Sequence, residues 1–229
     1  MSRRRKLEKF ADLKRFDQVY EMTEPGSEIV IQNLSTQKIM KGLWRSDAFS
    51  NEHPLCIELA CGRGEYTIAL GRKYPETNYI GVDIKGARIW QGATIAREEE
   101  LENVAFLRIR IEQLVNYFDP EEVDEIWITF PDPFPGKENR RLTSNRFLDS
   151  YHRILKKGGI VNFKTDDNDL FEYSLEIARA STKYRLVYNN DNIYDSSLYL
   201  EELEIKTYYE RQHLSNKKTI KYLQLEKID

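Results

Sequence analysis

The chain has 229 residues, of which 40% are hydrophobic and 32% are charged, and its formal net charge is −3. This length favours one sizeable α/β domain with small extensions and leaves little room for a second domain. The slightly negative charge excludes a uniformly basic nucleic-acid coat, so any basic surface has to be a segregated patch.

The cysteines, histidines and apolar runs bear on location and metal binding. Cys56 and Cys61 alone predict neither a disulfide framework nor a zinc site. The three histidines, His53, His152 and His213, have no metal-ligand spacing. No apolar run approaches the roughly 20 residues that a membrane helix needs, and the basic N-terminus lacks the apolar core of a signal peptide. We therefore expect a cytoplasmic protein that binds neither a membrane nor a metal.

Residues 1–50 are predicted to form a basic N-terminal arm and a lead-in segment. Leu7, Phe10 and Leu13 recur at helical spacing, and Pro25-Gly26 is predicted to end this pattern. The basic residues of the arm are Arg3, Arg4, Arg5, Lys6, Lys9, Lys14 and Arg15. Such arms often contact nucleic-acid phosphates, although a solvated tail has the same composition.

Residues 51–229 are predicted to form one domain of alternating strands and helices. Strands are predicted at 55–59, 78–83, 104–109, 125–130, 160–166, 184–190 and 219–227. Helices are predicted at 65–74, 87–101, 112–118, 146–159 and 170–181, the fourth ending on a glycine C-cap. The pattern indicates an α/β fold: a doubly wound, mostly parallel sheet with helices on both faces and an antiparallel C-terminal strand.

The loop after the first of these strands is a candidate ligand site, because ligands of such sheets bind beyond the carboxyl ends of the strands. It reads Glu58-Leu-Ala-Cys-Gly62-Arg-Gly64. The glycines let a ligand approach the backbone, and Asp83, about 20 residues on, can bind ribose hydroxyls. A glycine pair can also simply make a tight turn. Strand, loop, helix and acid at this spacing together favour a nucleotide-like cofactor.

Two details favour S-adenosylmethionine over a dinucleotide. Thr67 stands where the dinucleotide fingerprint has glycine or alanine, and Glu58 would repel a pyrophosphate in a partly desolvated pocket. The carboxylate of Glu58 would instead attract the sulfonium and ammonium groups of S-adenosylmethionine. The stretch LKKGG, residues 155–159, resembles the turn before the fifth strand of class I methyltransferases.

The end of the fourth of these strands carries the stretch IWITFPDPFPGKENRRL. Pro131 and Pro133 restrict the backbone around Asp132, so its carboxylate should be preorganised beside the reactive end of the methyl donor. The alternative is an aspartate that caps the next turn, as aspartate before proline often does.

The motifs FPDPFPGKENRRL, KTD and TYYER resemble those of the bacterial tRNA (guanine-N7-) methyltransferases, in this order and from about Glu58 to the C-terminus. The resemblance implies a class I, Rossmann-like methyltransferase domain over residues 51–229, with S-adenosylmethionine as methyl donor. It also implies tRNA as partner and N7 of the variable-loop guanine, tRNA position 46, as the methyl acceptor. A monomer and a homodimer are both compatible with the sequence.

The resemblance also implies site residues. Cofactor contacts would come from Glu58, Gly62, Gly64, Asp83, Arg110, Ile111 and Asp132. Substrate contacts would come from Lys137, from Asp166 and from the stretch Thr207 through Glu210, and Asp132 would also be catalytic. The chain departs from the family at Ala60, which replaces a glycine, at Phe134, which replaces a tryptophan, and at Arg110, where aspartate is common. Ile111, Glu112 or the backbone would then make the adenine contact.

The implied reaction is a direct displacement, because guanine N7 already presents a lone pair and needs no base. The protein can speed the reaction by aligning the two reactants and by stabilising the positive charge that forms on the guanine. Asp132, Asp166 or Glu210 could accept hydrogen bonds from the guanine. Phosphate contacts are predicted for the arm and for Lys137, Arg140, Arg141 and Arg146. The alternatives are an amino-group methyltransferase, a noncatalytic tRNA-binding protein that retains the fold, and a nicotinamide oxidoreductase.

Overall fold

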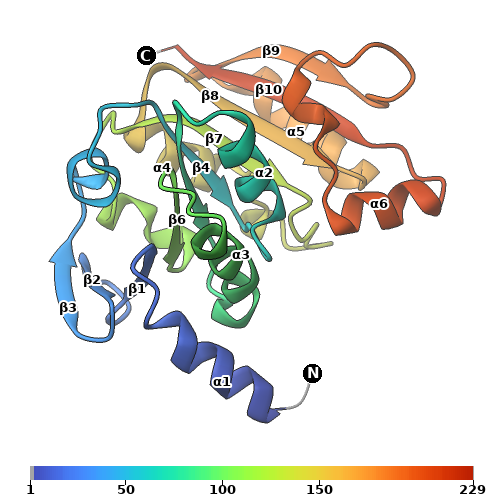
Figure 1. Ribbon diagram of the computed structural model, residues 1–229. Helices are drawn as coiled ribbons and strands as arrows, with labels where there is room; N and C mark the ends of the chain where they lie inside the picture. Colours follow the sequence, from blue (N-terminus) through green and yellow to red (C-terminus); the bar gives the residue numbers. More distant parts are fainter. Residues whose placement is uncertain (1–2, 229) are drawn as a thin grey trace.

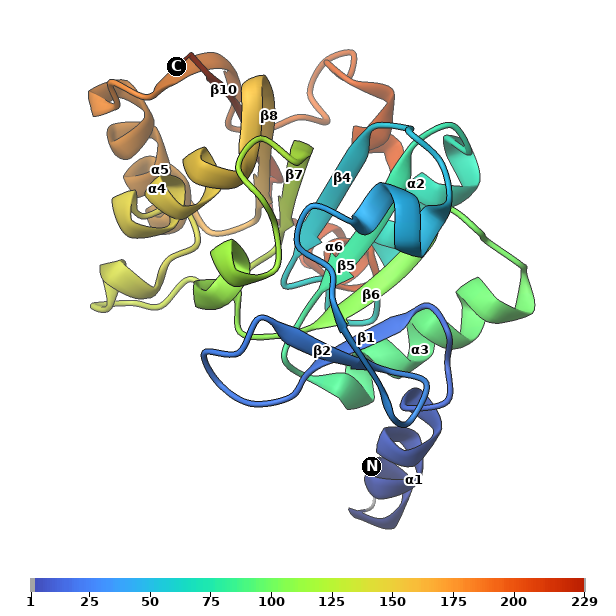
Figure 2. The same ribbon diagram turned by 90° about the vertical axis from the view of Figure 1, so that its left-hand side faces the viewer.

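A computed structural model describes residues 3–228 of the protein, with side chains from Glu8 onward. The described residues form one sheet of ten strands in the order β3-β2-β1-β6-β5-β4-β7-β8-β10-β9, with helices on both faces (Figures 1 and 2). The parallel centre consists of β6 (Val104–Arg108), β5 (Asn78–Val82), β4 (Leu55–Leu59), β7 (Val123–Thr129) and β8 (Leu155–Thr165). β10 (Lys221–Lys227) runs antiparallel between β8 and β9 (Tyr184–Asn190). This arrangement confirms the predicted fold class.

Side-chain alternation along the strands divides the core into two layers. In β4, Leu55, Ile57 and Leu59 pack with the layer that includes α4 (Asn145–Ile154) and α5 (Asn168–Ala180). Cys56 points to the opposite layer, under α2 (Glu65–Lys73) and α3 (Gly86–Glu98). Parallel strands covered on both faces are apolar nearly throughout, which is why the prediction located them well.

The N-terminal fifty residues were predicted only in part. Helix α1 (Arg3–Leu13) ends at Leu13, and β1 (Val19–Met22) pairs parallel with β6. The expectation that Pro25-Gly26 ends the helix is wrong, because the dipeptide turns the chain between β1 and β2 (Ile29–Gln32). β3 (Thr36–Ile39) pairs with β2 and is mostly exposed. The division into residues 1–50 and 51–229 stays a prediction, although β1 belongs to the same sheet.

The glycine C-cap predicted for α4 is also wrong. The helix ends at Ile154, and the stretch LKKGG opens β8, with Leu155 paired to Val123. The register shifts after this pair, and Gly158 takes a left-handed φ of +74° in the irregular part. Burial of Leu155 in the core favours the strand over one more helical turn.

The sheet brings the carboxyl ends of its central strands to one edge. β4 lies between β5 and β7, so the loop after β4 faces the ends of both neighbours. Helix α6 (Tyr208–Ser215), which follows the short 3-10 helix Glu201–Glu204, reaches the same edge (Figure 1). None of the helices within residues 3–228 has the length and apolarity required to cross a bilayer.

Candidate functional site

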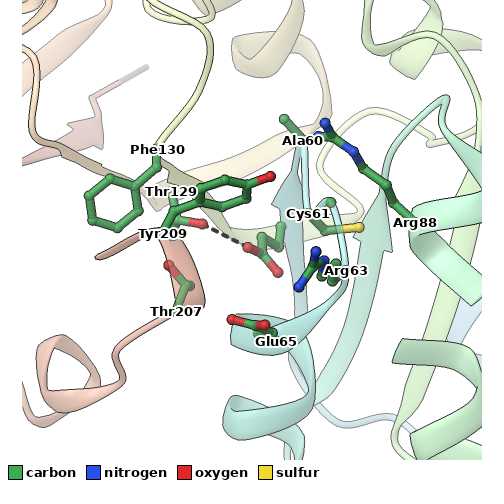
Figure 3. A pocket seen from close by; sticks show the side chains of 11 residues that line it. Ala60, Cys61, Arg63, Glu65, Arg88, Thr129, Phe130, Thr207 and Tyr209 are labelled. Atoms are coloured by element: carbon green, nitrogen blue, oxygen red, sulfur yellow. Dashed lines mark hydrogen bonds between the residues drawn. The ribbon is translucent and has the colours of Figure 1, made fainter. Parts of the chain in front are cut away.

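An open cavity lies beyond the carboxyl ends of β4 and β7 (Figure 3). Its floor is Glu58 of β4, followed by residues 60–63 of the glycine loop. Thr129 and Phe130 at the end of β7 form a second side. The remaining lining residues are Glu65, Arg88 of α3, and Thr207 and Tyr209 at the start of α6. Segments far apart in the sequence therefore meet at one opening.

Glu58 is a buried carboxylate with no cationic partner among the described residues. Its side chain is 3% exposed. One carboxylate oxygen accepts hydrogen bonds from the backbone N–H of Thr67 (2.9 Å) and from the Thr67 hydroxyl, and the other accepts from the Thr129 hydroxyl (2.8 Å). Burial raises the pKa of Glu58 to about 7, against these hydrogen bonds, which favour the ionised form. A floor of this kind suits a positively charged ligand.

The glycine loop takes left-handed backbone conformations at three positions. Ala60, Gly62 and Gly64 have φ of +57°, +58° and +71°. Gly64 is required on steric grounds as well, because a Cβ there would lie 2.6 Å from the ring of Phe106. At Ala60, the departure from the family's glycine, the left-handed conformation is strained by about 1 to 2 kcal/mol.

Asp83 follows β5 and holds this loop in place. One carboxylate oxygen accepts from the Gly62 N–H at 3.0 Å, and the other accepts from the Lys85 N–H at 2.8 Å. Each oxygen thus keeps a lone pair for a further donor, such as a ribose hydroxyl. The predicted proximity of Glu58, Gly62 and Asp83 follows from the pairing of β4 with β5.

Asp132 lies outside the cavity lining. Its side chain is exposed, whereas Pro131 before it is buried. Phe130 and Phe134, on either side of the Pro-Asp-Pro stretch, have left-handed φ of +50° and +45°. Such values are rare for bulky residues and store strain, so the surrounding fold has to hold this turn in shape.

Arg141 is one of the groups that hold the Pro-Asp-Pro turn in shape. Its Nε donates to the Pro133 carbonyl at 3.0 Å, and its guanidinium lies 4.6 Å from the centre of the Tyr173 ring. The side chain is buried. In this structure the guanidinium faces inward and satisfies a carbonyl of the strained turn, and the phosphate contact of Arg141 stays a prediction.

Other predicted site residues also lie outside the cavity lining: Gly64, Asp83, Arg110, Ile111, Lys137, Asp166 and Glu210. Arg110 is exposed at the start of the 3-10 helix Ile111–Asn116, and Ile111 packs against the core. Lys137 is exposed before the 3-10 helix Glu138–Arg140. Their roles in binding stay predictions.

The later motifs meet beside the cavity. Asp166, after β8, pairs with His213 Nδ1 at 3.2 Å and with Lys218 at 2.5 Å. Thr207 lines the cavity and caps α6, since its hydroxyl accepts from the Glu210 N–H at 3.2 Å.

Glu210 is predicted to contact the substrate, but the structure places its carboxylate fully inside the protein. It pairs with the equally buried ammonium of Lys164 at 2.7 Å and accepts from the Tyr194 hydroxyl at 2.5 Å. The Lys164 ammonium also donates to the carbonyls of Leu203 and Ile205, both at 3.2 Å. In this arrangement Glu210 fastens α6 and the segment before it to β8, and it does not reach the cavity.

Several lining residues were missed from the sequence. Thr129 carried a usable signal, because it is a polar residue at the end of an apolar strand. Arg63 and Arg88 carried none of their own: their positions around the cavity depend on how the loop and α3 pack together. Tyr209 was not missed, because it lies within the stretch Thr207 through Glu210.

The strand order, the antiparallel β10 between β8 and β9, and a cavity over the glycine loop define a class I methyltransferase fold. The crystal structure of the 16S rRNA methyltransferase KamB shares this fold, with a TM-score of 0.65 at 14% identity, covering 85% of this chain and 97% of that one. A second structure, the antibiotic-resistance methyltransferase Kmr, has a TM-score of 0.56 at 16% identity, covering 81% of this chain and 90% of that one.

Sequence comparison identifies the family within this class. Residues 52–223 match the family model described as "Putative methyltransferase". The chain is 44% identical over 218 residues to the tRNA (guanine-N(7)-)-methyltransferase of Bacteroides thetaiotaomicron, which covers 95% of this chain and 84% of the relative. It is 41% identical to that of Christiangramia forsetii, covering 97% and 98%. The chain belongs to the tRNA (guanine-N7-) methyltransferase family, whose members depend on S-adenosylmethionine, and the family predicted from its motifs is confirmed.

Proposed function

We propose that this protein transfers a methyl group from S-adenosylmethionine to N7 of the variable-loop guanine of tRNA, in the cytoplasm. The observation that carries the proposal is Glu58, a buried carboxylate without a cationic partner among the described residues, at the floor of the cavity of a chain that belongs to this family. The ionised form of such a floor would repel an anionic ligand, whereas it would attract a sulfonium or ammonium group.

The residues around the cavity fit the methyl donor. Glu58 lies where it can face the cationic part, the left-handed loop at residues 60–64 exposes backbone to a close approach, and Asp83 has lone pairs left for ribose hydroxyls. S-adenosylmethionine, when bound, supplies a methyl carbon on a positively charged sulfur. The protein's part is to hold that carbon in line with the acceptor nitrogen.

The acceptor needs charge stabilisation and not a base, because the guanine becomes cationic as N7 is methylated. Asp132 is our candidate for this role. Its carboxylate is exposed two residues beyond Phe130, which lines the cavity, and the held turn limits where it can point. Asp166 is the second candidate, although in this structure Lys218 pairs with it and His213 Nδ1 lies 3.2 Å from the same carboxylate.

The tRNA surface is proposed to surround the same opening. Arg63 and Arg88 are exposed and line the cavity, and Lys137, Arg140 and Arg146 are exposed on the segment after the Pro-Asp-Pro turn. Exposed cations at a mouth of this kind can meet phosphates on either side of an extruded base.

The direct test is methyl transfer from labelled S-adenosylmethionine to bulk tRNA, followed by nucleoside analysis. We expect 7-methylguanosine as the labelled nucleoside. Label in a base methylated on an exocyclic amine would favour the amino-group alternative and contradict the proposal.

A further inference from the structure

Two neighbouring tyrosines at the start of α6 have nearly the same exposure but different surroundings. Tyr208 and Tyr209 are 41% and 42% exposed. Of the two, only Tyr209 lines the cavity, where Figure 3 shows its ring over the opening, beside Phe130 and above Thr207.

The ring of Tyr208 already has partners. It lies 5.1 Å from the guanidinium carbon of Arg63, and its hydroxyl accepts from the Gln212 side chain at 2.9 Å. Its backbone N–H donates to Glu65. These contacts account for Tyr208 within the fold.

The ring of Tyr209, by contrast, has almost no partners within the protein. Among the described residues, no hydrogen bond or ion pair holds its hydroxyl, and its aromatic neighbour is Tyr208, met edge-on at 5.7 Å and 77°. An aromatic face left open over a polar cavity, when apolar surface is better buried, points to a flat ligand.

The backbone under this ring is nevertheless rigid. Glu210, the next residue, is fixed by the buried pair with Lys164 and by Tyr194, and Thr207 caps the helix two residues earlier. The ring is thus an exposed surface on a fixed base, a preorganised arrangement that needs little ordering when a ligand arrives.

We propose that Tyr209 is the stacking surface for the target guanine, an inference that rests on the proposed function. With the methyl donor on the floor at Glu58 and Thr129, the base has to enter beside Phe130 and Tyr209, which also line the cavity. Extruded bases are commonly held by stacking on aromatic side chains.

The face of the Tyr209 ring would stabilise charge during the reaction as well as hold the base. The N7 lone pair forms the bond to the methyl carbon, and the carbon–sulfur bond breaks with its electrons remaining on sulfur. Positive charge thereby leaves the sulfonium and appears on the guanine. The electron-rich face of Tyr209 attracts a cation more strongly than a neutral base, so it stabilises the transition state beyond the bound tRNA.

The test compares Tyr209→Leu and Tyr209→Phe with the matched control Tyr208→Leu, which removes an equally exposed ring from the neighbouring position. Single-turnover methylation is measured with tRNA and S-adenosylmethionine saturating, and the two dissociation constants are measured separately. We expect Tyr209→Leu to slow the step by about tenfold or more, with Tyr209→Phe and Tyr208→Leu within about threefold of wild type. Affinity for the methyl donor should change less than about twofold in all three.

Two results would overturn the inference while leaving the proposed function intact. An unchanged rate in Tyr209→Leu would mean that the ring does not meet the base, and a selective loss of affinity for S-adenosylmethionine would mean that it contacts the cofactor. Absence of 7-methylguanosine with the wild-type protein would overturn both.

Discussion

The charge state of Glu58 links the buried floor of the cavity to binding. Desolvation raises the pKa of this carboxyl to about 7, because the Thr67 and Thr129 hydrogen bonds only partly replace its hydration. The group is therefore protonated below about pH 7 in the free protein and ionised above it. A cationic ligand favours the ionised form, so its binding should release a proton.

Affinity for S-adenosylmethionine should accordingly tighten as the pH rises through about 7 and then level off, with a slope of up to about tenfold per unit below that point. Calorimetry over a pH series measures it. Glu58→Gln should weaken binding and remove this dependence while leaving Arg63, Glu65 and Arg88 of the same cavity unchanged. An affinity of the wild type that does not vary with pH would contradict the assignment.

Asp132 offers a second test at the level of one residue. Asparagine keeps its size but removes its charge, so single-turnover methylation should fall on the order of 10²-fold with both ligands saturating. Because the side chain is exposed, thermal stability should not change. Asp195→Asn neutralises another exposed carboxylate and serves as the control. A wild-type rate in Asp132→Asn would identify Asp132 as a turn-capping residue.

Helix α6 is fastened to the sheet by the ion pair of Lys164 with Glu210. Both side chains are fully buried, and their charges satisfy each other together with Tyr194 and two carbonyls. Removal of one partner leaves the other charge buried and unpaired, whereas removal of both leaves no unpaired charge.

Lys164→Met and Glu210→Leu should therefore each lower the free energy of unfolding by about 3 to 5 kcal/mol, and the double variant should recover much of that stability. Urea denaturation of the four proteins measures the coupling. Additive effects would show that the pair does not act as a unit.

At the level of helices and strands, the sequence predicts some features and not others. The unit β4–α2–β5 was located from its apolar strands and turn residues, and with it the relation of Glu58 to the glycine loop. The strands β1 to β3 were missed because four-residue strands near an edge carry little periodicity. The partner of Glu210 and the exposure of Tyr209 were also out of reach, since both depend on the packing of α6 against β8.

The molecule as a whole carries a small negative charge, so tRNA binding depends on where its cations gather. Helix α1 packs on α3, the helix that bears Arg88, and the ammonium of Lys9 lies 4.1 Å from the Trp90 ring. Phe16, three residues after α1 ends, lies 4.3 Å from the guanidinium of Arg97. The side chains of Arg3 to Lys6 fall outside the described ones. Helix α1 thus lies next to the helix that carries Arg88 of the proposed tRNA surface.

Deletion of residues 2–6 should weaken tRNA binding and make it less dependent on salt, by roughly one unit of the log–log slope for each phosphate that these residues neutralise. Titrations at several salt concentrations measure this slope. Affinity for S-adenosylmethionine should be unaffected. A slope equal to that of the full chain would show that the arm does not bind phosphates.

The central claim is that the acceptor is N7 of one guanine, in the variable loop. The most direct measurement uses two tRNA transcripts that differ only there, guanine in one and adenine in the other, incubated with the protein and S-adenosylmethionine. Chain cleavage at 7-methylguanine, resolved nucleotide by nucleotide, then locates the methyl group. We predict one cleavage at the variable-loop guanine of the first transcript and none in the second. Equal methylation of both transcripts, or cleavage at a different guanine, would contradict the account.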